Sequence, residues 1–211
     1  MRMRKKPNLI PRLERCARVG ISEPERCRGR WAERFPGFSE LFLELGCGKG
    51  RFTADFAAQN PKTLIVAVER VPEAIVVAME RACEKDLTNL RFVLGDAKQL
   101  GELFAPGEVS RILLNFCDPW PKHRDAKRRL TAKDFLMCYA QLLPPGGELW
   151  FKTDNQPLFE WSIEQFDACG WELKTLTRDL HTDGPVEPMT DYEVKFFGQG
   201  VPINRLIAVR E

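Results

Sequence analysis

Short apolar runs alternate with longer amphipathic stretches along most of the chain, from Leu41 onward. The short runs are typical of buried strands and the amphipathic stretches of helices, because their apolar residues recur with different periods. Strands are expected over 41–45, 64–68, 90–94, 111–116, 148–153, 171–176, 192–197 and 203–209, and helices over 52–59, 72–85, 132–142 and 156–169. This alternation predicts a mostly parallel, doubly wound α/β sheet, whose closing strands are antiparallel because the connections between them are short.

Length and charge indicate one domain with an extension. The chain has 211 residues, of which 44% are hydrophobic, and this is enough to bury one full core. Eleven lysine and arginine residues stand against four glutamates in residues 1–35, whereas the whole chain carries a net charge of only +2. Prolines interrupt this basic segment, which favours short turns or helices. We therefore expect a basic extension over residues 1–38 and an α/β domain over residues 39–211.

Seven cysteines are scattered along the chain without a C-x-x-C pair. This pattern supports neither a disulfide framework nor a zinc site, and it indicates a reducing compartment. The basic N-terminus lacks the apolar core of a signal peptide, and no apolar run approaches the roughly 20 residues of a membrane helix. The sequence therefore predicts a soluble cytoplasmic protein that binds neither a membrane nor a metal.

A glycine-rich turn, LELGCGKGRF, follows the first expected strand and holds Gly46, Gly48 and Gly50. Glycines at such a turn let the backbone approach a ligand closely, although a glycine triplet alone is as typical of an ordinary turn. Glu69 ends the second expected strand, where a carboxylate can accept hydrogen bonds from both hydroxyls of a ribose. Together these positions predict a nucleotide-like cofactor.

The spacing of the glycines distinguishes between cofactors. A dinucleotide-binding turn needs glycine or alanine at position 51, but Arg51 stands there. Glu44, just ahead of the glycines, would repel a pyrophosphate and would stabilise a cationic sulfonium with an amino-acid tail. Asp96, after the third expected strand, could accept from an adenine amino group or could serve an ordinary Asx turn. These features favour S-adenosylmethionine over NAD.

An acidic and basic segment, DPWPKHRDAKRR, runs from Asp118 to Arg129 directly after the apolar run RILLNF and Cys117. Ligands of open parallel sheets bind outside the carboxyl ends of the strands, so Asp118 is placed to meet a substrate. The basic residues that follow indicate a polyanionic substrate, although a run of charges on its own is usually a solvated loop.

These motifs resemble those of known enzymes. E-x-G-C-G-x-G, the acidic end of the second strand and G-D-A after the third resemble the Rossmann-like methyltransferases that use S-adenosylmethionine. FCDPWPKHRDAKRRL, FKTD at 151–154 and TDYEVKF from residue 190 resemble the bacterial tRNA (guanine-N7-)-methyltransferases, and the resemblance covers residues 40–210. It implies a Rossmann-like methyltransferase fold and methylation of guanine 46 in the variable loop of tRNA.

The resemblance also implies roles for individual residues. The expected cofactor pocket consists of Glu44, Gly46, Gly48, Gly50, Glu69, Asp96 and Asp118, and Asp118 is also the expected catalytic residue. The expected substrate contacts are Lys122, Asp154, Thr190, Asp191, Tyr192 and Glu193, and the expected RNA contacts are Arg124, Lys127, Arg128 and Arg129. The sequence departs from the family at Cys117, where many relatives have proline, and at His123 and Asp125, which interrupt the basic stretch.

Three alternatives stay open at this point: an S-adenosylmethionine enzyme that acts on another RNA or a small molecule, an RNA-binding protein without activity, and an NAD-dependent dehydrogenase, which Arg51 disfavours. The expected partner is tRNA, and the basic extension, with Trp31, Phe35 and Phe38 nearby, is a candidate clasp around it. A monomer and a homodimer both fit the sequence.

Overall fold

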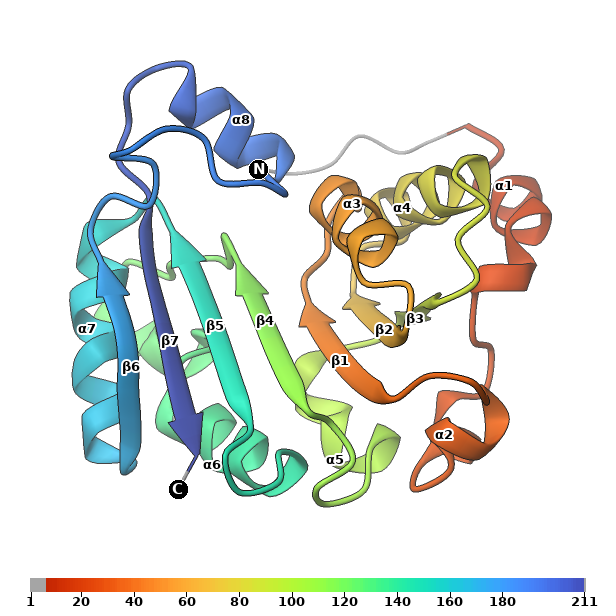
Figure 1. The fold of residues 1–211 in the computed structure, drawn as a ribbon, viewed down its shortest axis with the longest axis horizontal. Coiled ribbons are helices and arrows are strands. Elements are labelled where there is room, and N and C mark those ends of the chain that lie inside the picture. Colours follow the sequence, from red (N-terminus) through yellow and green to blue (C-terminus); the bar gives the residue numbers. More distant parts are fainter. Residues whose placement is uncertain (1–6, 211) are drawn as a thin grey trace.

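The computed structural model describes residues 7–210, which form a seven-stranded sheet flanked by helices (Figure 1). The strands are β1 (Glu40–Leu45), β2 (Thr63–Glu69), β3 (Leu90–Leu94), β4 (Arg111–Asn115), β5 (Glu148–Thr153), β6 (Trp171–Thr177) and β7 (Asn204–Arg210). The α-helices are α1 (Leu9–Arg15), α2 (Trp31–Arg34), α3 (Arg51–Gln59), α4 (Pro72–Glu84), α5 (Leu100–Leu103), α6 (Lys133–Leu142), α7 (Gln156–Ala168) and α8 (Asp191–Phe197). Short 3-10 helices are η1 (Ala17–Val19), η2 (Pro24–Cys27), η3 (Ala97–Gln99) and η4 (His123–Arg128).

The strand order in the sheet is β3-β2-β1-β4-β5-β7-β6. Strands β1 to β5 are parallel, whereas β7 runs antiparallel between β5 and β6. The chain moves outward from β1 to β3 and then returns to place β4 on the other side of β1, so the order reverses between β1 and β4. This topology confirms the predicted doubly wound sheet with antiparallel closing strands. Sheets of this kind bind ligands where the strand order reverses.

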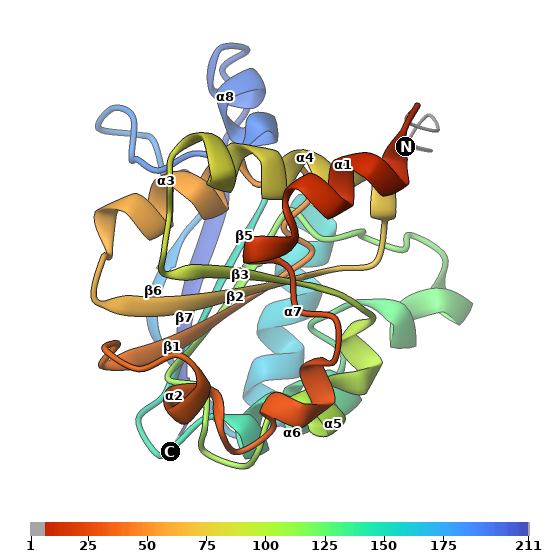
Figure 2. The same ribbon diagram turned by 90° about the vertical axis from the view of Figure 1, so that its right-hand side faces the viewer.

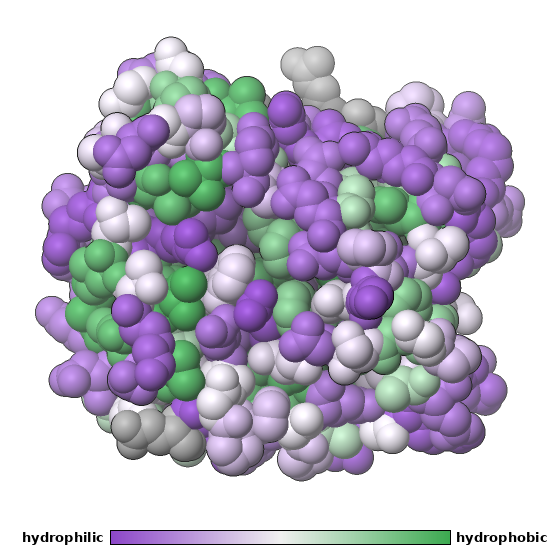
Figure 3. Space-filling model, in the orientation of Figure 1, coloured by the Kyte–Doolittle hydropathy of each residue, from purple (hydrophilic) through white to green (hydrophobic). Residues whose placement is uncertain are grey.

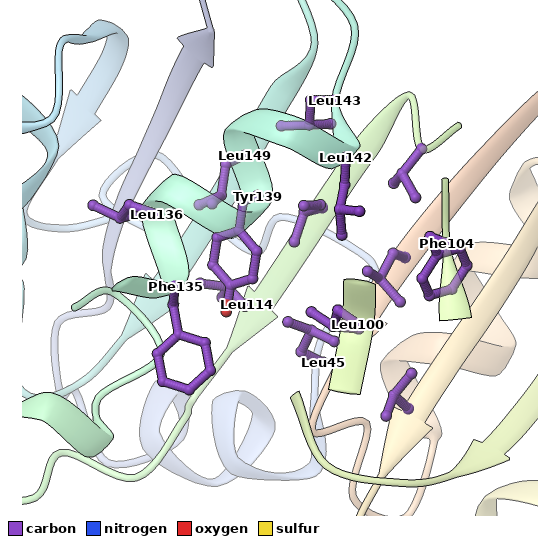
Figure 4. Close-up of a cluster of buried hydrophobic side chains, with 14 of the residues drawn as sticks. Leu45, Leu100, Phe104, Leu114, Phe135, Leu136, Tyr139, Leu142, Leu143 and Leu149 are labelled. Atoms are coloured by element: carbon purple, nitrogen blue, oxygen red, sulfur yellow. The ribbon is translucent and has the colours of Figure 1, made fainter. Parts of the chain in front are cut away.

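Helices cover both faces of the sheet (Figure 2). Helices α1, α3 and α4 lie on one face, and α5, α6 and α7 lie on the other. Successive residues of a strand point to opposite faces, so Leu41, Leu43 and Leu45 of β1 belong to one apolar cluster and Phe42 to the other. Figure 4 shows part of the first cluster, in which Tyr139 of α6 packs among leucines. Packing on both faces fixes the strands and therefore the positions of their ends.

The described part of the basic extension, residues 7–38, shares this core. Trp31 is fully buried, its Nε1 donates to the carbonyl oxygen of Leu103 at 3.0 Å, and its ring stacks on Phe104. The prediction that Trp31 helps to clasp RNA is therefore wrong, because its ring is not accessible. Deleting the segment up to residue 35 would remove a core side chain, so such a deletion could not separate lost RNA contacts from lost stability. The extension also contains Arg2, Arg4, Lys5 and Lys6, which lie outside the described residues.

The predicted strand over 192–197 is wrong, because this segment forms the helix α8. A capping box begins the helix: Glu193 N donates to Thr190 Oγ1 at 2.9 Å, and Thr190 N donates to Glu193 Oε2 at 3.1 Å. Tyr192 and Phe196, one helical turn apart, stack on each other. These local contacts outweigh the alternating apolar pattern that favoured a strand. Helix α8 lies beyond the carboxyl ends of β4 and β5, at the top of Figure 1.

Candidate active site

A cavity of about 760 Å³ lies at the carboxyl ends of the parallel strands, where the strand order reverses. The glycine turn, residues 46–50, forms one wall, and residues 95–98 after β3 form another. Residues 68–71 around the end of β2, residues 115–118 around the end of β4 and residues 190–192 at the start of α8 also line it. A volume of this size is typical of small-molecule and cofactor sites.

The glycine turn has the backbone geometry that the sequence predicts. Gly46, Gly48 and Gly50 have φ angles of 75°, 56° and 71°, in the left-handed region that favours glycine. Gly50 also packs directly against α4, because a Cβ there would lie 2.5 Å from the Cβ of Ala78. A Cβ at Gly46 or Gly48 would have no described atom within 4 Å. The turn therefore packs tightly against α4 at Gly50 and leaves room for a ligand at Gly46 and Gly48.

Backbone N–H groups hold the acidic residues at the ends of β2 and β3. Glu69 accepts from Gly48 N and from Val71 N, each at 2.9 Å. Asp96 Oδ1 accepts from Lys98 N at 3.0 Å and caps η3, so the Asx turn considered for Asp96 is present. Both side chains also line the cavity. A carboxylate oxygen that accepts one hydrogen bond keeps a second lone pair, and both residues can still bind a ligand.

Glu44 is buried at the end of β1, beside the cavity. Its Oε1 accepts from Asn115 Nδ2 at 3.1 Å, whereas its Oε2 has no hydrogen-bond partner among the described residues. Burial raises the pKa of Glu44. The side chains of Thr53 and Asn115 and the positive charge of Lys152 favour the ionised carboxylate and lower the pKa, but by less. A buried carboxylate with an unused oxygen fits a ligand that carries positive charge and N–H donors, as S-adenosylmethionine does.

Glu44→Gln is expected to stabilise the cofactor-free protein at neutral pH and to weaken cofactor binding. Because the folded-state pKa is raised, the wild-type carboxyl group stabilises the fold below its unfolded-state pKa, at about 4, and loses this contribution as the pH rises through the folded-state pKa. The free energy of unfolding of the variant should therefore increasingly exceed that of the wild type from about pH 4 toward neutral pH. Urea denaturation at several pH values measures this difference, and calorimetric titration measures cofactor binding. A difference independent of pH would contradict the argument.

Asp118 lies at the cavity, three residues beyond the end of β4. Its side chain is 61% exposed, and its Oδ2 lies 3.2 Å from Nη2 of Arg70. An ion pair this exposed is weak, so the Asp118 carboxylate can exchange Arg70 for another donor.

The two cysteines of the cavity are not suited to nucleophilic catalysis. Burial raises the pKa of the Cys117 thiol to about 12 and raises the pKa of Cys47 well above its usual value. Both thiols are therefore protonated at neutral pH.

Within residues 7–210, no group of three or more His, Cys, Asp or Glu side chains could hold a metal ion, and no helix has both the length and the apolar character to cross a membrane.

The predicted RNA contacts divide into accessible cations and one structural arginine. Arg124 and Lys127 are exposed, and so is Lys122, a predicted substrate contact that is not a cavity residue. The guanidinium of Arg128 stacks over the ring of Trp120, 3.6 Å from the ring centroid, and both residues line the cavity.

Arg129 is the structural member of this set. Its guanidinium donates to the carbonyl oxygens of Pro119 and Trp120, at 3.0 and 3.1 Å, and stacks over the ring of Trp161. These contacts shape the loop that carries Asp118.

The predicted substrate residues also separate. Those that line the cavity are Thr190, Asp191 and Tyr192. Glu193 is fully buried instead, and both its carboxylate oxygens accept from Lys152 Nζ. Asp154 is exposed just beyond β5, outside the set of cavity residues, and Asn155 rather than Asp154 caps α7.

The sequence motifs do not include some of the cavity residues. Asn115 binds Glu44, Arg70 pairs with Asp118, and Lys195 extends from α8. The polar end of the apolar run RILLN was a usable signal for Asn115. No motif indicates Arg70 or Lys195, because their proximity to the cavity depends on how the strands and α8 are placed.

Solved structures of methyltransferases share this fold. The structure of the 16S rRNA methyltransferase KamB covers 87% of this chain and 94% of its own length, with a TM-score of 0.64 and 16% sequence identity. The structure of an antibiotic-related methyltransferase covers 85% of this chain and 92% of its own, with a TM-score of 0.65 and 18% identity. At such low identity these likenesses show the fold alone, which is the Rossmann-like methyltransferase fold.

Sequence similarity identifies the family. Residues 39–206 match the family model described as "Putative methyltransferase". The tRNA (guanine-N(7)-)-methyltransferase of Listeria welshimeri is 44% identical over 209 residues, which are 99% of this chain and 98% of that protein. The proteins of the same name from Lachnoclostridium phytofermentans and Lactococcus lactis subsp. cremoris are 44% and 42% identical, and they cover 90% and 99% of this chain and 90% and 97% of their own lengths. Because the similarity extends over nearly the whole chain, this protein belongs to the family of the tRNA (guanine-N(7)-)-methyltransferases.

Proposed function

We propose that this protein transfers a methyl group from S-adenosylmethionine to N7 of guanine 46 in the variable loop of tRNA. The observation that carries the proposal is the similarity, over 99% of the chain, to a relative named as a tRNA (guanine-N(7)-)-methyltransferase. The cavity supports it, because the acidic residues near the ends of β1 and β2 and after β3 share one space with Asp118. The motifs FCDPWPKHRDAKRRL and TDYEVKF, which resemble the substrate side of the family, support tRNA as the substrate.

S-adenosylmethionine would supply a methyl group made electrophilic by a sulfonium. The contribution of the chain is to bind and orient this cofactor. The buried carboxylate of Glu44 would attract its positive charges, Glu69 would accept from the ribose hydroxyls, and Asp96 would accept from the adenine amino group. The glycine turn leaves room beside these groups.

Asp118 is suited to stabilise the transition state rather than to remove a proton. Guanine N7 carries a free lone pair and no proton, so its methylation requires no general base. As N7 gains the methyl group, the purine becomes cationic and its N1–H and N2–H groups become stronger donors. A carboxylate that accepts from this edge binds the transition state more tightly than the ground state. At about 4 Å and an effective dielectric constant near 20, one such interaction is worth on the order of 4 kcal/mol before desolvation.

The exposed cations after Asp118 would bind tRNA phosphates. Lys122 precedes η4, and Arg124 and Lys127 lie on it, so all three share one loop with Asp118. Phosphate contacts orient an RNA without reading its sequence, and they weaken as salt increases. The loop would therefore hold the tRNA backbone close to the carboxylate that meets the base.

The test is transfer of labelled methyl from S-adenosylmethionine to an unmodified tRNA transcript, followed by chemical cleavage at 7-methylguanine. We expect label at guanine 46, and no label at that position in a transcript with adenine 46. Label at another guanine would retain the methyltransferase and reject the assigned position. Absence of label despite binding of cofactor and tRNA would reject the proposed activity.

A further inference from the structure

A buried cluster of Lys152, Glu193 and His181 joins α8 to the rest of the protein. Lys152 Nζ, near the end of β5, donates to Glu193 Oε1 at 3.0 Å and to Glu193 Oε2 at 2.8 Å. Nε2 of His181, from the loop between β6 and α8, lies 3.2 Å from Glu193 Oε1. The side chains of Lys152, Glu193 and His181 are 10%, 0% and 3% exposed. Lysine and glutamate are almost never buried to this extent unless they are paired.

His181 approaches the same carboxylate from the loop between β6 and α8. Its Nδ1 accepts from Val186 N at 3.1 Å, so the proton of the neutral ring is on Nε2, the atom that faces Glu193. This N–H is not aligned for a hydrogen bond and has no other partner among the described residues. The ring packs edge-on against Phe197, with 5.1 Å between ring centroids. His181 therefore contacts α8 at two positions one helical turn apart.

The apolar contacts of helix α8 include those of Phe116, whose ring stacks on Tyr192 and on Phe196. The helix has seven residues, and a helix this short is not stable by itself in water. Tyr192, Val194 and Phe197 are 53%, 37% and 39% exposed, and apolar surface is visible over α8 at the upper left of Figure 3. Glu193 is the only fully buried residue of α8, so the deepest contact of this helix is made by a carboxylate.

The remaining ion pairs of α8 lie on the surface. Asp191 Oδ2 lies 3.1 Å from Arg81 Nη1, and Asp191 Oδ1 lies 4.0 Å from Arg51 Nη1. These side chains are about a third or more exposed, and exposed ion pairs contribute little to stability. They add to the contacts of α8 with α3 and α4 but do not replace the buried cluster.

We propose that Lys152, Glu193 and His181 are positioning residues, which hold α8 at the cavity so that Thr190, Asp191 and Tyr192 meet the target guanine. Glu193 then acts through Lys152 and does not contact the substrate, unlike the role that the family resemblance implies for it. The inference rests on the proposed function only for the identity of the substrate. The arrangement of α8 itself can be measured in the protein without RNA.

Charge explains how the cluster would act. Removal of one partner leaves an uncompensated charge in a buried place, which is strongly unfavourable, whereas removal of both charges together is often tolerated. A single unpaired charge is hydrated at the lowest cost in free energy when α8 moves away from the sheet and water enters. The apparent affinity for tRNA then falls by the fraction of molecules in which α8 is still in place.

Glu193→Gln, Lys152→Met and the double variant test this inference. Glutamine at position 193 can still accept from Thr190 N, so the capping box survives. We expect each single variant to raise the KM for tRNA about tenfold or more and to lower kcat less, because bound tRNA draws α8 back into place. The double variant should have a lower KM than either single variant. His181→Leu should raise KM in the same direction as the single variants.

Hydrogen exchange of the amides of residues 190–197, in the absence of RNA, gives a readout that does not depend on activity. Each single variant should lose protection there, and the double variant should regain it. The matched control is the exposed pair of Lys174 and Glu172, whose Nζ and Oε2 lie 3.1 Å apart on β6. Lys174→Met and Glu172→Gln should change neither protection nor KM.

The outcomes separate the two roles of Glu193. Normal protection of 190–197 in Glu193→Gln together with lost methylation would overturn the inference, because Glu193 would then act on the substrate directly. A double variant no better than Glu193→Gln in both readouts would also overturn it. If the wild-type protein methylated no guanine in tRNA, the proposed function would fail, while the hydrogen-exchange result would still decide whether the cluster holds α8.

Discussion

Asp118→Asn is expected to lower the kcat for tRNA methylation by on the order of 10²-fold, the loss typical of one group that stabilises charge in a transition state. Asparagine has nearly the same shape, but its neutral amide stabilises the cationic purine less than a carboxylate does. The side chain is 61% exposed and its pair with Arg70 is weak, so the melting temperature should hardly change. Single-turnover methylation at saturating cofactor and tRNA measures the chemical step, and thermal denaturation measures the fold.

Asp154→Asn is the matched control for this prediction. Asp154 stands just beyond β5, the strand next to β4, but it is not a cavity residue and does not cap α7. We expect Asp154→Asn to lower kcat by much less than Asp118→Asn. Equal losses in the two single variants, with no further loss in the double variant, would mean that both carboxylates act on the same step and would refute the assignment to Asp118 alone.

Polar residues at strand ends were predictable from the sequence. Glu44 and Glu69 lie near or at the end of an apolar run and Asp118 follows one, and the carboxyl ends of parallel strands meet at one edge of the sheet. The alternation of strand and helix patterns was therefore enough to predict that these residues share a space. The positive φ angles of the glycine turn were predictable for the same local reason, since the turn had to connect a strand directly to a helix.

Contacts between segments distant in the sequence were not predictable. The pattern around Trp31 is that of a basic arm, yet its ring enters the core formed with residues 103 and 104. The charge pattern indicates that Arg129 is one more RNA contact, yet its guanidinium stacks over the ring of Trp161 in α7. In both cases the partner is a backbone oxygen or an aromatic ring, and the pattern of charged residues in the sequence does not indicate such partners.

Helix α8 shows how a wrong prediction of secondary structure, made from alternating apolar residues, changes the assignment of functional residues. TDYEVKF reads as a strand because apolar residues alternate, but Thr190 and Glu193 have the spacing of a capping box. In a strand, the side chains of residues 191 and 193 would point to the same face. In the helix, Asp191 lines the cavity while Glu193 is buried against Lys152. The four residues that the family resemblance groups together are therefore divided between the cavity and its support.

Gly50→Ala is expected to lower the free energy of unfolding and to abolish most cofactor binding. The φ angle of 71° costs about 1–2 kcal/mol for a residue with a Cβ. The added Cβ would also lie 2.5 Å from the Cβ and 2.8 Å from the Cα of Ala78, and an overpacked core contact costs about 1–3 kcal/mol more. Because the obstacle includes the backbone of α4, α3 or α4 must move, and α3 begins directly after the cavity wall formed by residues 46–50.

Gly107→Ala separates the two contributions. Gly107 has the same φ angle of 71°, but a Cβ there has no described atom within 4 Å, and the residue is not part of the cavity. It should lose only the backbone contribution, about 1–2 kcal/mol, and keep its cofactor affinity. Urea denaturation and calorimetric titration of the two variants measure both quantities. If Gly50→Ala lost no more stability than Gly107→Ala and bound the cofactor normally, the contact between the glycine turn and α4 would not be what positions the cavity wall.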